Sequence, residues 1–170
     1  MIKAAAIMLI ILGFVFFGYC ITGYQQNRVD ALNEIVRLIS FMKTRLRYDC
    51  LPLSALLKAY EENGKRNVLA FVGNCRESTE HGKPFSAAWR ESIENDRELN
   101  KLLKNVTSSL INLGEDLGTT DLDGQLSCCD YYEKIFSDEL CEREEQNKKY
   151  SKLCPVLGAM LGIWAAILIV

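Results

Sequence analysis

The sequence contains a single histidine, and its seven cysteines form neither a C-x-x-C pair nor a Cys/His cluster. Zinc sites need several such ligands at short spacing, so these residues exclude a structural zinc site. An odd number of scattered thiols also argues against a disulfide scaffold and favours a reducing compartment, where cysteine packs as a small apolar residue. We expect neither a metal nor any other cofactor.

The chain also lacks a basic surplus, since 20 Lys and Arg are set against 22 Asp and Glu. Nucleic-acid binders carry a clear excess of positive charge, so nucleic acid is not an expected partner. Paired carboxylates at 61–62 and 144–145 lie in stretches of mixed charge, as on a solvated helix face. No acid, base and nucleophile occur in a catalytic arrangement, and we expect that the protein is not an enzyme.

Charge is nearly missing from both ends of the chain. Residues 2–22 contain only Lys3, and residues 153–170 contain no charged residue. About 20 helical residues cross a hydrocarbon core of about 30 Å, so both segments are predicted to be transmembrane helices. Cys20 follows a tyrosine where a lipoprotein signal needs a small residue, so we expect the first span to be retained. A buried core helix is the alternative for the second span.

Basic residues accumulate on the inner side of both predicted spans, which places residues 24–150 in the cytoplasm by the positive-inside rule. Basic side chains close to a membrane are attracted to anionic lipid headgroups. The residues expected to face the membrane are Arg28, Lys65, Arg66, Arg97, Lys148, Lys149 and Lys152.

Between the spans the apolar residues recur every three or four positions, which predicts helices, and no stretch alternates like a strand. The expected fold is all-α, an antiparallel bundle of about six helices flanked by N- and C-terminal transmembrane helices. Pro52 and Pro84 each mark a helix start. The helices are expected near 29–46, 53–62, 68–80, 85–93, 96–117 and 122–140.

Short connections make such helices run up and down. The turns at 49–52, 81–84 and 114–121 should therefore share one end of the bundle, distal to the membrane. The last of these turns lies in a segment rich in glycine, which either caps two helices or forms a binding surface. A phosphate loop would need the lysine that follows its last glycine, and the acids here do not fit the spacing of a calcium-binding EF-hand.

Three features together resemble a known family. The N-terminal span runs directly into the first helix, a terminal helix is apolar, and the glycine segment reads Leu113-Gly114-x-x-Leu117-Gly118-x-Thr120-Asp121-x-x-Gly124-Gln125. With these features the whole chain resembles the stage III sporulation protein AB family of endospore-forming bacteria. The glycine segment and the helix start at 52–56 are also similar to cytoplasmic domains of the platform protein of type II secretion and type IV pilus systems.

The resemblance implies a component of the channel between mother cell and forespore, located in the mother-cell membrane that faces the forespore. It implies other channel proteins, a secretion-type ATPase and membrane lipids as partners, and several copies could assemble together. Alternatives are a platform-like protein of a pilus or secretion system and a membrane-tethered regulator. The residues expected to bind the partner are Gly114, Leu117, Gly118, Thr120, Asp121, Gly124 and Gln125.

Overall fold

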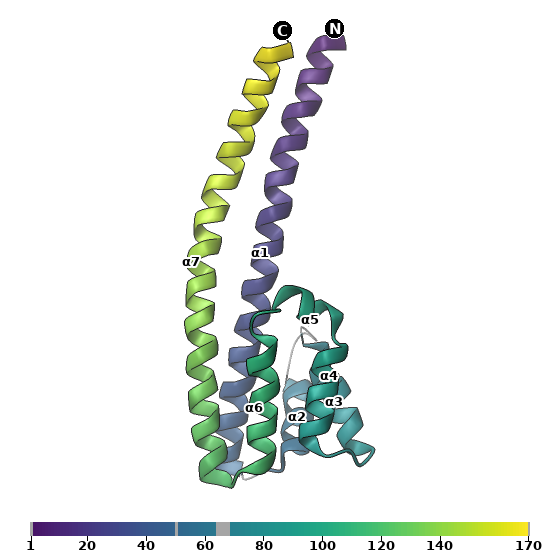
Figure 1. The fold of residues 1–170 in the computed structure, drawn as a ribbon, viewed down its shortest axis with the longest axis vertical. Helices are drawn as coiled ribbons and strands as arrows, with labels where there is room; N and C mark the ends of the chain where they lie inside the picture. The colour runs from purple at the N-terminus through teal and green to yellow at the C-terminus, as the bar shows by residue number, and fades with distance from the viewer. Residues whose placement is uncertain (1, 50, 64–68, 170) are drawn as a thin grey trace. The chain divides into compact units, whose positions relative to one another are not determined.

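The structure is a computed structural model that describes residues 2–49, 51–63 and 69–169, with side chains mainly between 23 and 151. The described residues form seven α-helices and no strand, which confirms the predicted all-α class (Figure 1). The helices are α1 (Ile2–Asp49), α2 (Leu53–Asn63), α3 (Ala70–Glu80), α4 (Phe85–Asn95), α5 (Arg97–Leu102), α6 (Thr107–Thr119) and α7 (Leu122–Ile169).

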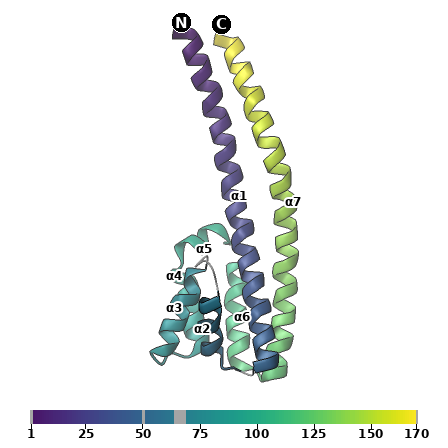
Figure 2. The same ribbon diagram turned by 180° about the vertical axis from the view of Figure 1, so that it is seen from behind.

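The chain divides into two compact units, and α1 and α7 each contribute to both. The bundle unit comprises Asp30–Leu140, and the hairpin unit comprises Met1–Val29 with Cys141–Val170. In the hairpin unit the first part of α1 and the last part of α7 lie side by side, as both views show (Figures 1 and 2). There the Asn147 Nδ2 donates a hydrogen bond of 2.7 Å to the Gln26 Oε1.

Most side chains of the two predicted transmembrane segments, residues 2–22 and 153–170, lie outside the described part of the chain. Residues 2–22 belong to α1 and residues 153–169 to α7, so the backbone of both segments is helical. Within the described residues, no helix has a stretch long and apolar enough to cross a membrane.

The bundle unit differs from the sequence-based expectation at one helix. We predicted a single helix over 96–117, but α5 ends at Leu102 and α6 begins at Thr107. The carbonyl of Leu103 accepts the backbone N–H of Val106 at 2.8 Å and the hydroxyl of Thr107 at 3.0 Å. The backbone of Leu103 leaves the helical region, with φ −125° and ψ 34°, and α5 ends there. The other predicted helices are confirmed to within a few residues.

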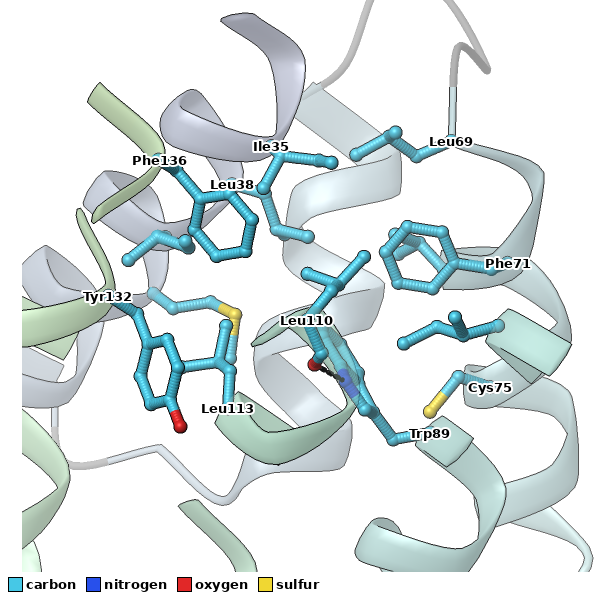
Figure 3. Close-up of a cluster of buried hydrophobic side chains, with 14 of the residues drawn as sticks. Ile35, Leu38, Leu69, Phe71, Cys75, Trp89, Leu110, Leu113, Tyr132 and Phe136 are labelled. Atoms are coloured by element: carbon cyan, nitrogen blue, oxygen red, sulfur yellow. Dashed lines mark hydrogen bonds between the residues drawn. The ribbon is translucent and has the colours of Figure 1, made fainter. Parts of the chain in front are cut away.

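The core of the bundle unit is built around Trp89 on α4 (Figure 3). Its indole is fully buried, and the Nε1 donates a hydrogen bond of 2.7 Å to the carbonyl of Leu110. The rings of Phe71 and Trp89 meet edge to face, with centroids 5.2 Å apart. A buried indole N–H needs an acceptor, and here α6 supplies it, so the hydrogen bond links α4 to α6 inside the core.

Gly114 is the residue that allows this contact. A Cβ atom on Gly114 would lie 2.0 Å from the Trp89 Cδ1, which is far inside van der Waals contact. Gly118, one turn later on α6, faces the start of α4, where an added Cβ would lie 3.3 Å from the Ser86 Cβ. The antiparallel pair α4 and α6 therefore packs closely at both glycines, but only Gly114 has no room for a methyl group.

A matched pair of substitutions separates these two glycines. Gly114→Ala should destabilise the fold by about 2–3 kcal/mol, because the methyl group must displace the buried indole. Gly118→Ala should change the free energy of unfolding by less than about 1 kcal/mol, because better helix propensity offsets a tight contact with a small side chain. Denaturation of the full chain in detergent, followed by near-ultraviolet circular dichroism, measures both, and equal losses would contradict the packing described.

Candidate functional site: the turn between α6 and α7

The α6–α7 turn, residues 114–125, contains all seven residues predicted to bind a partner. The chain leaves α6 at Thr119, and Thr120 is extended with φ −104° and ψ 159°. The Oδ1 of Asp121 then accepts the N–H of Gly124 at 3.0 Å. This bond satisfies one of the free donors at the start of α7, so Asp121 is the N-cap of that helix.

Side chains also occupy the free carbonyls at the end of α6. The hydroxyl of Thr120 donates to the carbonyl of Asp116 at 2.8 Å. The amide Nε2 of Gln125 reaches back from α7 and donates to the carbonyl of Leu117 at 3.0 Å and to that of Thr120 at 3.2 Å. Helix ends leave such carbonyls without partners, so these bonds hold the turn in one conformation.

Gly124, the third glycine of the segment, allows α7 to begin close to the extended residue Thr120. A Cβ atom on Gly124 would lie 2.8 Å from the Cβ of Thr120 and 2.9 Å from the Oδ1 of Asp121. A larger residue at this position would therefore push the cap apart. The residues of this segment thus serve the fold. Gly114 allows close helix packing, Asp121 caps α7, and Gln125 bonds back to the end of α6.

The predicted residues lie at different depths in the turn. Gly114 and Leu117 are buried, Gly124 and Gln125 are half-buried, and Gly118, Thr120 and Asp121 are exposed. Leu122, whose exposed fraction is 40 %, and Asp123 are exposed as well. A partner at this turn would meet side chains of the motif together with those between its residues.

The surroundings of the turn are acidic. The chain has no Lys or Arg from Asn105 to Glu133, while the same stretch carries Glu115, Asp116, Asp121, Asp123, Asp130 and Glu133. Other elements supply the counter-charges: Arg90 on α4 pairs with Glu115, and the Lys43 Nζ lies 2.5 Å from Asp130 and 2.7 Å from Glu133. The carboxylates raise the pKa of Lys43 by hydrogen bonding.

Two tyrosines also tie the helices of the bundle unit together. The hydroxyl of Tyr132 on α7 donates to the Oδ2 of Asp116 on α6 at 3.0 Å. The hydroxyl of Tyr60 on α2 donates to the Oε1 of Glu34 on α1 at 2.6 Å. Burial, followed by the hydrogen bond to the carboxylate, raises the pKa of both phenols above the ordinary value.

The cysteines of the bundle unit that are described lie at different depths. Cys75 and Cys129 are fully buried, and burial raises the pKa of each thiol to about 12. Cys128 is half-buried, and burial with a contribution from Asp116 raises its pKa to about 11. These thiols pack as small apolar groups in their protonated form. Over the part of the chain that the structure describes, no three His, Cys, Asp or Glu side chains gather as metal ligands do.

The basic residues predicted to face the membrane are distributed over both units. Arg97 is exposed at the first position of α5 in the bundle unit. The hairpin unit contains Arg28 on α1, half-buried, with Lys148 and Lys149 exposed on α7. The three others, Lys65, Arg66 and the side chain of Lys152, lie outside the described residues.

Sequence reasoning missed the pairing of Trp89 with Gly114, on which the position of the turn depends. A glycine at a core position of a helix, in a bundle with one tryptophan, is the signal that could have found it. The pair Arg90 and Glu115 was also missed, because ion pairs between helices follow from packing and leave no local pattern.

The fold and the turn define a helical-bundle protein whose first and last helices continue beyond the bundle unit. The family model for stage III sporulation protein AB matches residues 3–170, and the chain belongs to that family. Its role is therefore in sporulation. No curated protein and no solved structure is significantly similar to the chain.

The raised tyrosine pKa values predict how stability depends on pH. A phenol whose pKa is higher in the folded state stabilises the fold fully below about pH 10 and loses this contribution as pH rises, because only the unfolded phenol ionises there. The free energy of unfolding should therefore fall between about pH 9.5 and 11. In the double variant Tyr60→Phe/Tyr132→Phe that fall should be smaller.

The control for this experiment is the same pair of proteins at pH 7.5, where the double variant should be less stable by about 1–2 kcal/mol through loss of two hydrogen bonds. Near-ultraviolet circular dichroism during denaturation of the full chain gives both values. Parallel pH profiles for the two proteins would show that the phenols are not shielded as described.

Proposed function

We propose that the chain is a non-enzymatic, membrane-anchored adaptor in the channel that joins mother cell and forespore, and that it docks a secretion-type ATPase through the α6–α7 turn. The observation that carries the proposal is membership of the stage III sporulation protein AB family over residues 3–170. The structure contributes support of a different kind, because it shows a rigid turn with an exposed acidic surface.

The hairpin unit supports the anchoring part of the proposal. Because α1 and α7 run antiparallel there and Gln26 bonds Asn147, Tyr24 and Tyr150 lie close to the same level of the pair. Tyrosine is enriched where a helix passes from water into lipid. The charged side chains Lys148 and Lys149 lie on one side of this level.

The apolar side chains that are described lie on the other side of that level and are exposed. Phe16 is 71 % exposed and Met160 61 %, and Leu153, Val156 and Leu157 are also exposed. Exposed large apolar side chains on a paired helix surface favour contact with lipid or another chain. From Tyr24 to Lys3 along α1 and from Tyr150 to Ile169 along α7 each helix rises about 30 Å, the thickness of a hydrocarbon core.

The anchoring part predicts the behaviour of the protein in cell fractionation. The full chain should remain in the membrane fraction after washing with alkaline carbonate, which releases proteins held only by charge. Replacing Leu157 and Met160 by aspartate should move it to the supernatant or abolish accumulation, because a charge at the centre of a membrane helix costs about 3 kcal/mol. Release of the unaltered chain by carbonate alone would refute the anchor.

The docking part assigns the contact to exposed side chains of the turn. Leu122 offers an apolar contact and Asp123 a negative charge in the first turn of α7. Asp121 is less suitable for mutational tests, because its carboxylate caps the helix. A partner face that carries basic side chains around an apolar centre fits this surface by charge.

The docking part is tested by complementing a deletion strain. Deletion should abolish heat-resistant spores and late forespore transcription after normal engulfment. The variant Leu122→Ser/Asp123→Lys should restore neither, since a charge reversal in an interface weakens binding by roughly tenfold or more. Asp138→Lys should restore both, because it changes the same helix at an exposed position about 22 Å away.

Two results would oppose the proposal. Full complementation by Leu122→Ser/Asp123→Lys would remove the turn from the docking surface. Normal sporulation of the deletion strain would remove the channel role itself and favour the platform-like protein or the membrane-tethered regulator.

A further inference from the structure

A shallow groove lies between α4 and α6, next to the α6–α7 turn, with which it shares Glu115 and Thr119. Its volume is about 500 Å³, and it is lined by Ser86, Ala87, Arg90, Glu91, Glu94, Glu115 and Thr119. All of these residues belong to the bundle unit. The site predicted from the sequence contains none of them.

The shape of the groove follows from the close packing of the two helices. Gly118 lies close to Ser86, where an added Cβ would be 3.3 Å from the Ser86 Cβ, so only small side chains separate the two helices at this end of the groove. On α4 the lining positions 87, 90, 91 and 94 repeat at helical spacing, as do 115 and 119 on α6. Two such rows on antiparallel helices border a groove that fits the side-chain ridge of a third helix.

The charges along the groove are mostly negative. Arg90 is the one basic residue of the lining, and its guanidinium is paired with Glu115 across the groove. Glu91 is paired with Lys83, which is not part of the lining, and Glu94 is exposed at the other end of the groove. A helix with acidic side chains would be repelled here, whereas lysine or arginine side chains would meet carboxylates on both walls.

We propose that this groove receives a helix of a partner protein that carries lysine or arginine side chains along one face. The proposal rests on the adaptor function above, and it adds a second contact beside the turn. It also gives a role to two sequence features that the turn leaves unexplained: the helix start Pro84-Phe85-Ser86-Ala87, which resembles 52–55, and the exposed Gly118. Both border the groove.

Two substitutions test the groove without touching the core, and each has a matched control. Ala87→Trp fills the groove, and Ala70→Trp places the same side chain at another exposed helical alanine, on α3. Glu94→Lys reverses charge at the open end, and Glu98→Lys does so on α5, outside the groove. Far-ultraviolet circular dichroism and thermal unfolding of all four full-length variants should match those of the unaltered protein.

Binding is measured with a designed probe, since the partner itself is unidentified. The probe is a labelled synthetic amphipathic helix of alanine and leucine with four lysines on one face, and its twin carries glutamates at the same positions. The full chain in detergent micelles should bind the lysine peptide at least about tenfold more tightly than the twin. Ala87→Trp and Glu94→Lys should remove this preference, and Ala70→Trp and Glu98→Lys should keep it.

Hydrogen exchange locates the contact, because the bound lysine peptide should slow exchange at exposed ends of α4 and α6 and not at α2. Equal affinity for the two peptides, or binding unaffected by Ala87→Trp, would overturn the proposal. In cells, Ala87→Trp should reduce heat-resistant spores while Ala70→Trp does not. Normal spores with Ala87→Trp, together with loss in the deletion strain, would reject the groove and leave the adaptor function intact.

Discussion

The contact between the Trp89 indole and Gly114 determines the geometry of the rest of the bundle unit. The indole occupies the space where any residue other than glycine at position 114 would have its Cβ atom. The indole N–H donates to the carbonyl of Leu110, one turn before Gly114 on α6. A single side chain thereby fixes both the distance and the register between α4 and α6. The α6–α7 turn and the groove beside it are positioned by this contact.

The residues that identify the family are therefore mostly residues that build the turn. Asp121 caps α7, Gln125 binds the end of α6, and Gly124 leaves space for the cap. In the proposed docking role, Leu122 and Asp123 are better suited to contact a partner, because their side chains are exposed and make no bond that holds the turn together. The motif residues that bond or pack within the turn therefore serve the fold first.

The helices of the bundle were predictable because each one buries a stripe of apolar residues, and because Pro52 and Pro84 start helices. The break between α5 and α6 was not, since Leu99, Leu103, Val106 and Leu110 keep helical spacing across it. The break follows from the backbone of Leu103, whose φ of −125° and ψ of 34° lie outside the helical region, and the apolar spacing does not reveal it. The prediction that the α6–α7 turn and the start of α4 share one end of the bundle is confirmed, because Gly118 lies beside Ser86.

The site could be predicted only as a stretch of sequence. Its cap was foreseeable from Asp121, because aspartate before an apolar periodic segment starts helices. The partner of Gly114 lies 25 positions earlier in the chain, and the counter-charge of Glu115 comes from Arg90 on the same distant helix. Contacts of this kind depend on how helices pack, and a single sequence does not encode them in its spacing.

A double-mutant cycle between Trp89 and Gly114 tests the central claim most directly. If the indole fills the space of the missing Cβ, Gly114→Ala should be strongly destabilising in the unaltered protein. In a Trp89→Leu background the same change should be neutral or stabilising, because space is then available and alanine is the better helix former by about 1 kcal/mol. Equal effects of Gly114→Ala in both backgrounds would show that the two residues are not coupled and would contradict the account.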